Sequence, residues 1–183
     1  FQFYGHWLFT LGLISSHGGN LSISDGEKII ITRRDSMLGR LKAEDLVEVS
    51  LKEKTSEDRR ASRELVVHRA IYLNSPARAI IHAHPPLAVA LSLRANEIVP
   101  LDAEAKKVLP RIPVVEVKEA IGSEEVAAAV SLLFKEVPVV LVKGHGSFAA
   151  GPTLEAAFYA TTVLEMASRI ILGDYLLSDY PQS

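Results

Sequence analysis

The chain has 183 residues, 48% of them hydrophobic and 23% charged, which is typical of a globular protein with one sizeable core. Its 20 basic and 22 acidic residues give a net charge of −2, so no overall field attracts nucleic acid or an anionic membrane. The absence of cysteine excludes disulfides and thiolate metal sites. We find neither a signal peptide nor an apolar run of the roughly 18 residues that a membrane span needs. We therefore expect a cytoplasmic protein that binds neither nucleic acid nor membrane.

Helices and strands are intermixed along the chain. In chain order we expect a helix (1–14), three strands (21–24, 28–32, 46–51), a polar loop (52–63), a helix (62–74), a strand (77–84), a helix from Pro85-Pro86, a strand (113–117), a helix (124–134), a strand, turn and short strand (137–151) and a last helix (154–177). Asp25-Gly26 is typical of a hairpin turn, and Ser123 and Thr153 are typical helix caps. Because the alternation is not strict, we predict one layered α/β or α+β domain over residues 1–183.

Three histidines follow apolar strands. His82 and His84 are two residues apart on a predicted strand, so their side chains point to the same face. His145 follows another such strand and lies between Gly144 and Gly146, which leave its ring unobstructed. Three imidazoles fit a divalent ion such as Zn²⁺ and leave a position open for a carboxylate or a substrate. In the alternative, each histidine only forms a hydrogen bond at a strand end, but the spacing favours a metal site.

Glu64 is a candidate for the carboxylate. It precedes His68 by four residues, so the two would share a face of the predicted helix. The alternative is a surface glutamate with a helical partner. The residues by themselves thus predict a metal-dependent enzyme and leave its reaction open.

Five segments indicate a family: GGNLS at 18–22, IIIT at 29–32, SRELVVHRAIY at 62–72, IIHAHPP at 80–86 and VKGHGSFAAG at 142–151. In their order they resemble the class II aldolase/adducin family over nearly the whole chain, and within it the archaeal-type L-fuculose-1-phosphate aldolases. The resemblance implies an α/β/α domain with a central, mostly antiparallel sheet. It also implies a homotetramer with active sites at the subunit interfaces.

The resemblance also implies a reaction. His82, His84 and His145 would bind one Zn²⁺ per subunit, with Co²⁺ or Mn²⁺ as substitutes, and Glu64 would be the fourth ligand and the catalytic acid/base. The enzyme would reversibly cleave a sugar 1-phosphate to dihydroxyacetone phosphate and a short aldehyde through a metal-stabilised enediolate. Glu64 would take the proton of the C4 hydroxyl, and His68 would orient Glu64.

We predict that the phosphate of the substrate is bound by a group of five residues: Gly19, Asn20, Arg34, Ser62 and Arg63. The glycine, the asparagine and the serine match the family, whereas both arginines replace small hydrogen-bonding residues. We expect Arg34 or Arg63 to contact a phosphate or carboxylate through its guanidinium. In the alternative, the arginines are solvated or paired with Asp35 and Glu57.

A last departure concerns the acid that protonates the leaving aldehyde, a tyrosine of the neighbouring subunit in the fuculose phosphate enzyme. Glu104 stands at that position, close to Asp102, and this resembles the methylthioribulose-1-phosphate dehydratases. It keeps open a zinc lyase of the same fold that acts as dehydratase, epimerase or decarboxylase. Alternatively, Glu104 only stabilises a helix start, and Tyr175 or Tyr180 supplies the proton. A non-enzymatic scaffold such as the adducin head would lack the metal residues that this chain has.

Overall fold

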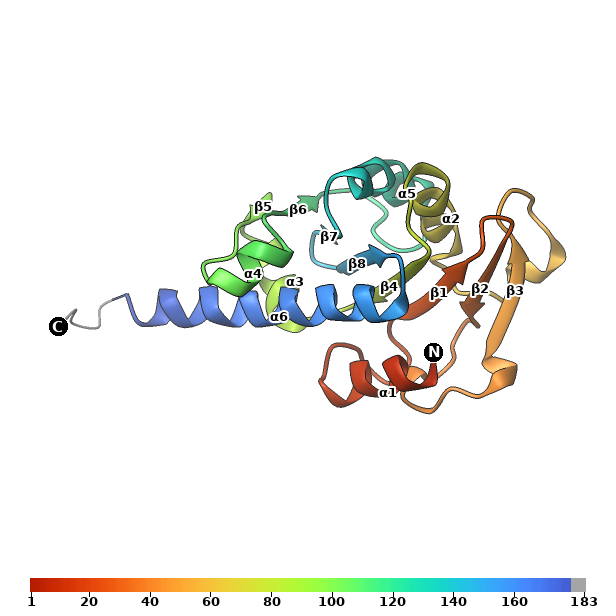
Figure 1. Cartoon of the computed structure of the whole chain (residues 1–183), viewed down its shortest axis with the longest axis horizontal. Coiled ribbons are helices and arrows are strands. Elements are labelled where there is room, and N and C mark those ends of the chain that lie inside the picture. The colour runs from red at the N-terminus through yellow and green to blue at the C-terminus, as the bar shows by residue number, and fades with distance from the viewer. Residues whose placement is uncertain (179–183) are drawn as a thin grey trace.

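The fold is built on one eight-stranded sheet in a computed structural model that describes residues 1–178 (Figure 1). Its strands are β1 (Asn20–Ser24), β2 (Lys28–Thr32), β3 (Leu46–Ser50), β4 (Ala79–Ala83), β5 (Glu97–Ile98), β6 (Ile112–Val115), β7 (Val139–Val142) and β8 (Gly146–Gly151). Their order is β3-β2-β1-β4-β8-β7-β6-β5. All neighbouring strands are antiparallel except β6 and β7. The expected mostly antiparallel sheet is therefore confirmed.

Helices cover both faces of this sheet. The α-helices are α1 (Gln2–Thr10), α2 (Leu65–Asn74), α3 (Pro86–Ser92), α4 (Ala103–Val108), α5 (Glu124–Ser131) and α6 (Leu154–Leu176), and the short 3₁₀ helices are η1 (Leu38–Arg40), η2 (Ala43–Asp45), η3 (Ser56–Arg59) and η4 (Leu132–Lys135). Helices α2 and α5 lie on one face, and α1, α3, α4 and α6 lie on the other (Figure 1). This is the α/β/α layering that the family resemblance implies.

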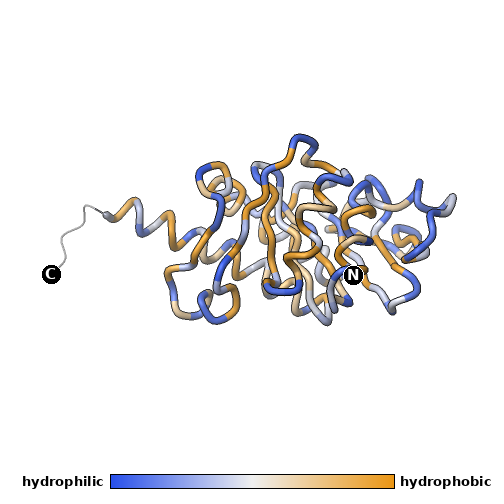
Figure 2. Tube along the Cα trace, turned by 90° about the horizontal axis from the view of Figure 1, so that it is seen from above, coloured by the Kyte–Doolittle hydropathy of each residue, from blue (hydrophilic) through white to orange (hydrophobic). Residues whose placement is uncertain are grey.

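The sheet is buried on both faces, which explains why its central strands read as apolar runs. All five residues of β4 are buried: Ile81 packs into the core beneath α6 and Ile80 into the core beneath α2 and α5. Hydrophobic segments gather in the middle of the molecule, while polar segments lie at the turns (Figure 2). Within residues 1–178, no helix has both the length and the apolar character needed to cross a membrane.

Several element boundaries differ from the predicted ones. The helix predicted over 1–14 ends at Thr10, and Gly12 follows with a φ of +69°. The helix predicted over 62–74 begins at Leu65, with Glu64 as its N-cap residue. The sequence did not predict β5 or the 3₁₀ helices, and it offered α4 only as the alternative in which Glu104 stabilises a helix start. Elements this short show too few residues for a clear hydrophobic period.

The antiparallel pairing brings the predicted site residues to one edge of the sheet. Asn20, where β1 begins, pairs with His82 near the end of β4. His82 in turn pairs with Phe148 of β8, three residues after His145. The start of β1, the end of β4 and the β7–β8 turn therefore meet at a common edge.

Candidate metal centre and substrate pocket

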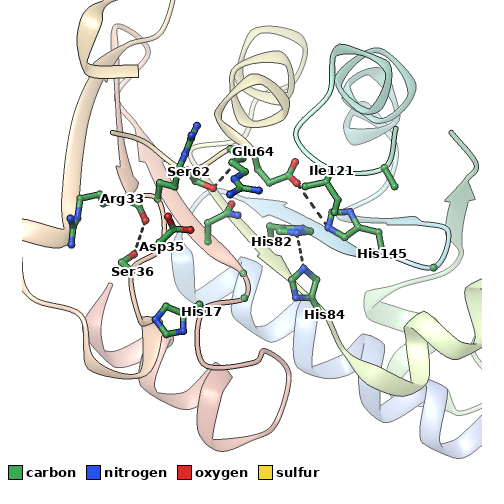
Figure 3. A pocket seen from close by; sticks show the side chains of 17 residues that line it. His17, Arg33, Asp35, Ser36, Ser62, Glu64, His82, His84, Ile121 and His145 are labelled. Carbon is green, nitrogen blue, oxygen red and sulfur yellow. Dashed lines mark hydrogen bonds and ion pairs between the residues drawn. The ribbon is translucent and has the colours of Figure 1, made fainter. Parts of the chain in front are cut away.

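The three predicted histidines lie together (Figure 3). One nitrogen from each ring lies within 4.8 Å of the nitrogens of the other two. The Nδ1–H of His82 donates a hydrogen bond to the carbonyl oxygen of Ser147 at 3.0 Å, which leaves Nε2 as the free lone pair. That Nε2 lies 3.0 Å from the Nε2 of His84. The rings thus converge on one point, as metal ligands do.

Glycines permit this convergence. A Cβ on Gly146 would lie 2.5 Å from the carbonyl oxygen of Ala83 and 2.6 Å from Cδ2 of His84, so only glycine lets β8 pass this close. Gly144 has a φ of +67° and forms the turn in which the N–H of His145 donates to the carbonyl of Val142 at 3.0 Å. Close contacts at Gly146 and the left-handed backbone at Gly144 therefore explain why glycine stands on both sides of His145.

Glu64 lies beside the histidines, with only 3% of its surface exposed. Its Oε1 accepts a hydrogen bond from the N–H of Gly122 at 2.9 Å and lies 4.0 Å from Nε2 of His145. Its Oε2 is buried and has no hydrogen-bond partner within residues 1–178. Burial raises the pKa of Glu64 to about 7, although the Gly122 bond opposes the shift. A carboxyl group with this pKa can accept and return a proton near neutral pH.

The histidines are neutral in the folded chain. Burial lowers the pKa of His82 well below its usual range, that of His84 to about 4, and that of His145 as well. Neutral imidazoles are the form that binds metal. Three of them, with a buried carboxylate oxygen that lacks a partner among the described residues, fit a divalent ion of the zinc type.

His68 does not contact the carboxyl group of Glu64 by a hydrogen bond among the described residues. Its Nδ1 lies 2.6 Å from Oγ of Ser22, which lies 2.6 Å from the hydroxyl of Tyr72. Complete burial lowers the pKa of His68 to about 3. The N–H of Gly122, rather than His68, therefore orients Glu64, and the sequence contained no signal for that glycine.

The histidines and Glu64 line a cavity of about 400 Å³ (Figure 3). The cavity is also lined by all five predicted phosphate-binding residues: Gly19, Asn20, Arg34, Ser62 and Arg63. The structure adds His17, Asp35 and Ile121, which the sequence analysis did not select as site residues. Only His17 had a signal, because it directly precedes the Gly-Gly-Asn turn.

The two arginines are exposed at this cavity, and neither has an ion pair within residues 1–178. Glu57 pairs with Arg60 at 2.8 Å instead, so the alternative pairing with Glu57 is not observed. Asp35 has a φ of +59°, a conformation that is costly for a residue other than glycine. The turn thus keeps a backbone form suited to glycine while it brings a carboxylate and a guanidinium to the cavity.

Glu104 does not line this cavity within one chain. It lies on α4 beside a separate cavity of about 230 Å³, where the hydroxyl of Tyr159 donates to its Oε1 at 3.3 Å. Asp102 caps α4 and lines the same smaller cavity. Tyr175 is exposed near the end of α6, and Tyr180 lies outside the described residues. An acid from this region would have to reach Glu64 from another copy of the chain.

Comparisons with known proteins agree with this arrangement. The profile described as "Class II Aldolase and Adducin N-terminal domain" matches residues 3–172. The L-fuculose phosphate aldolase of Methanocaldococcus jannaschii is 32% identical over 171 residues, which cover 93% of this chain and 92% of that protein. The methylthioribulose-1-phosphate dehydratase of Acidiphilium cryptum is 32% identical over 167 residues, covering 84% and 79% respectively.

The crystal structure of L-fuculose-1-phosphate aldolase from Thermus thermophilus has the same fold, with a TM-score of 0.94 and 37% sequence identity. The match covers 100% of this chain and 96% of that one. The chain therefore belongs to the class II aldolase and adducin family, as its motifs predicted.

Proposed function

We propose that the protein is a zinc-dependent aldolase that reversibly cleaves a sugar 1-phosphate similar to fuculose-1-phosphate. The products are dihydroxyacetone phosphate and a short aldehyde. The observation that carries this proposal is Glu64, a buried carboxyl group with a pKa of about 7, beside three neutral imidazoles in one cavity. The likeness to proteins named L-fuculose phosphate aldolase supports it.

In this proposal His82, His84 and His145 hold one Zn²⁺ per subunit, with Glu64 as the fourth ligand. Co²⁺ or Mn²⁺ can take its place, since the donors are imidazole nitrogens and a carboxylate. The bound ion supplies positive charge where the substrate oxygens become negative as the C3–C4 bond breaks. Once the substrate displaces Glu64 from the metal, its Oε2 would take the proton of the C4 hydroxyl, while Gly122 holds Oε1 in place.

The phosphate of the substrate binds in the same cavity. The backbone of Gly19, the amide of Asn20 and the hydroxyl of Ser62 offer hydrogen bonds there. Arg34 and Arg63, which lack an ion pair among the described residues, supply the charge. Their guanidinium groups also offset the carboxylate of Asp35, which would otherwise repel a phosphate.

A second candidate is a dehydratase of the same fold, and Glu104 favours it. A glutamate at this position, where the fuculose phosphate enzymes use tyrosine, is the feature shared with the methylthioribulose-1-phosphate dehydratases. Epimerase and decarboxylase reactions on a related sugar phosphate belong to the same alternative.

In either case we propose a homotetramer, in which Glu104 enters the cavity of a neighbouring subunit as the second catalytic acid/base. A composition without cysteine supports a cytoplasmic location.

Product analysis tests the proposal. The zinc-loaded protein is incubated with fuculose-1-phosphate and, separately, with methylthioribulose-1-phosphate, and the products are identified by mass spectrometry. We expect dihydroxyacetone phosphate from the first substrate, with a loss of at least ~100-fold in Glu64→Gln, because the amide cannot take the proton. A product that keeps all carbons and has lost water would identify the dehydratase. Full activity of Glu64→Gln would contradict both candidates.

A further inference from the structure

Helix α3 lies between His84 and the turn that carries His145. Its first residue, Pro86, follows His84 after one intervening proline, and its last residue, Ser92, contacts the turn that carries His145. We propose that α3 is a rigid spacer that sets the separation of His84 and His145. In this proposal Ser92 is a positioning residue for His145. This inference depends on the proposed metal centre.

The contact at the end of α3 is a buried hydrogen bond. Ser92 is completely buried, and its hydroxyl donates to the carbonyl of Val89 at 2.6 Å. Its oxygen accepts the N–H of Gly144 at 3.0 Å. Gly144 directly precedes His145, and the turn is closed by the N–H of His145, so the N–H of Gly144 is free to bind Ser92. The Ser92 hydroxyl therefore fixes the turn from outside.

The start of α3 is held by a buried carboxylate. Glu165 of α6 is only 4% exposed, and its Oε2 accepts the N–H groups of Leu87 at 3.1 Å and Ala88 at 3.2 Å. These N–H groups belong to the first turn of α3, where a helix has no partners of its own for them. A negative charge there is also favoured by the helix dipole.

The backbone of His84 is fixed as well, because its N–H donates to the carbonyl of Leu13 at 2.8 Å. Both ends of α3 are thus tied to fixed neighbours, and seven residues of rigid helix lie between them. Without the Ser92 hydroxyl, the Gly144 N–H would lose its buried acceptor, and the turn would shift to reach water. The ring of His145 would move with it.

Ser92→Ala tests this inference against Ser168→Ala as a matched control. Ser168 is also completely buried, but its hydroxyl donates only to Leu164 of its own helix, at 2.8 Å, among the described residues. Zinc affinity is measured by competition with a chelating dye, and the visible spectrum of the Co²⁺-loaded protein reports coordination geometry. We expect Ser92→Ala to weaken zinc binding about 10-fold or more and to alter the Co²⁺ spectrum, as second-sphere changes do. Ser168→Ala should stay within about twofold of the wild type in affinity.

Zinc affinity and a Co²⁺ spectrum of Ser92→Ala equal to those of Ser168→Ala would overturn the role of Ser92 while the metal centre stands. A wild-type protein that binds neither ion would instead overturn the metal centre itself. If Ser92→Ala does not fold, variants of Glu165, which binds the first turn of α3, give the test. Glu165→Gln keeps an acceptor for both N–H groups and should bind zinc more tightly than Glu165→Ala; equal affinities would contradict the inference.

Discussion

At the scale of single residues, the charge state of Glu64 distinguishes the site from a structural histidine cluster. The carboxyl group is buried, and one of its oxygens has no partner within residues 1–178. In the folded chain without metal it holds its proton up to a pH of about 7, whereas the ordinary value is 4.5. The folded state therefore binds more protons than the unfolded state between these values, and Glu64 lowers the free energy of unfolding as the pH rises through this range.

This difference predicts a pH dependence that Glu64→Gln removes. In the presence of a chelator, we compare the free energy of unfolding of the variant with that of the wild type. The difference in favour of the variant should grow by about 2 to 3 kcal/mol from pH 5 to pH 8. Urea denaturation of both proteins at the two pH values measures the gain. Glu27→Gln, at an exposed glutamate, is the control. If the difference between variant and wild type is the same at pH 5 and pH 8, Glu64 is ionised in the folded chain throughout this range.

The sequence predicted those site residues whose positions follow from local geometry. His82 and His84 lie two residues apart at the end of a strand, and the glycines beside His145 mark a tight turn. Tertiary contacts gave no local signal. Gly122 reaches Glu64 from a position 58 residues away, and Ser92 reaches Gly144 across 52 residues. Residues of this kind can be found only when the fold is known.

At the scale of elements, the predicted strands and helices that are bounded by typical turn or cap residues were confirmed. The Asp25-Gly26 hairpin forms between β1 and β2, and Ser123 and Thr153 cap α5 and α6 through their side chains. The start of α2 was placed three residues early, because a serine, an arginine and a glutamate before Leu65 look helical in sequence. The structure instead uses Glu64 as the N-cap residue, and its carboxyl group lies beside His145.

At the scale of the whole molecule, the surface supports an assembly. Helix α1 and the last turns of α6 expose large hydrophobic side chains, with Phe3 63% and Leu176 70% exposed. Such side chains are typical of surfaces that bind another protein. In the assembly that we propose, Glu104, which lines a different cavity from Glu64 of its own chain, enters the cavity of a neighbour.

Mixed assemblies test this arrangement. Glu64→Gln and Glu104→Gln subunits should each be inactive alone, but co-expression should restore about a quarter of wild-type activity. Random mixing of the two subunits gives this fraction of sites with both glutamates, if each site takes one glutamate from each of two subunits. Glu27→Gln co-expressed with Glu64→Gln controls for dilution. Activity that remains as low as that of the separate variants would place both glutamates in the same subunit. Full activity of Glu104→Gln alone would remove Glu104 from the reaction.

The account depends most directly on the three imidazoles as a metal site. The deciding measurement is an anomalous difference map, recorded at the zinc absorption edge from crystals of the protein grown with zinc. We predict one strong peak per chain between the ring nitrogens of His82, His84 and His145, next to the Glu64 carboxylate, and no peak there in His84→Ala. A map with nothing between the three rings of the wild-type protein would contradict the account.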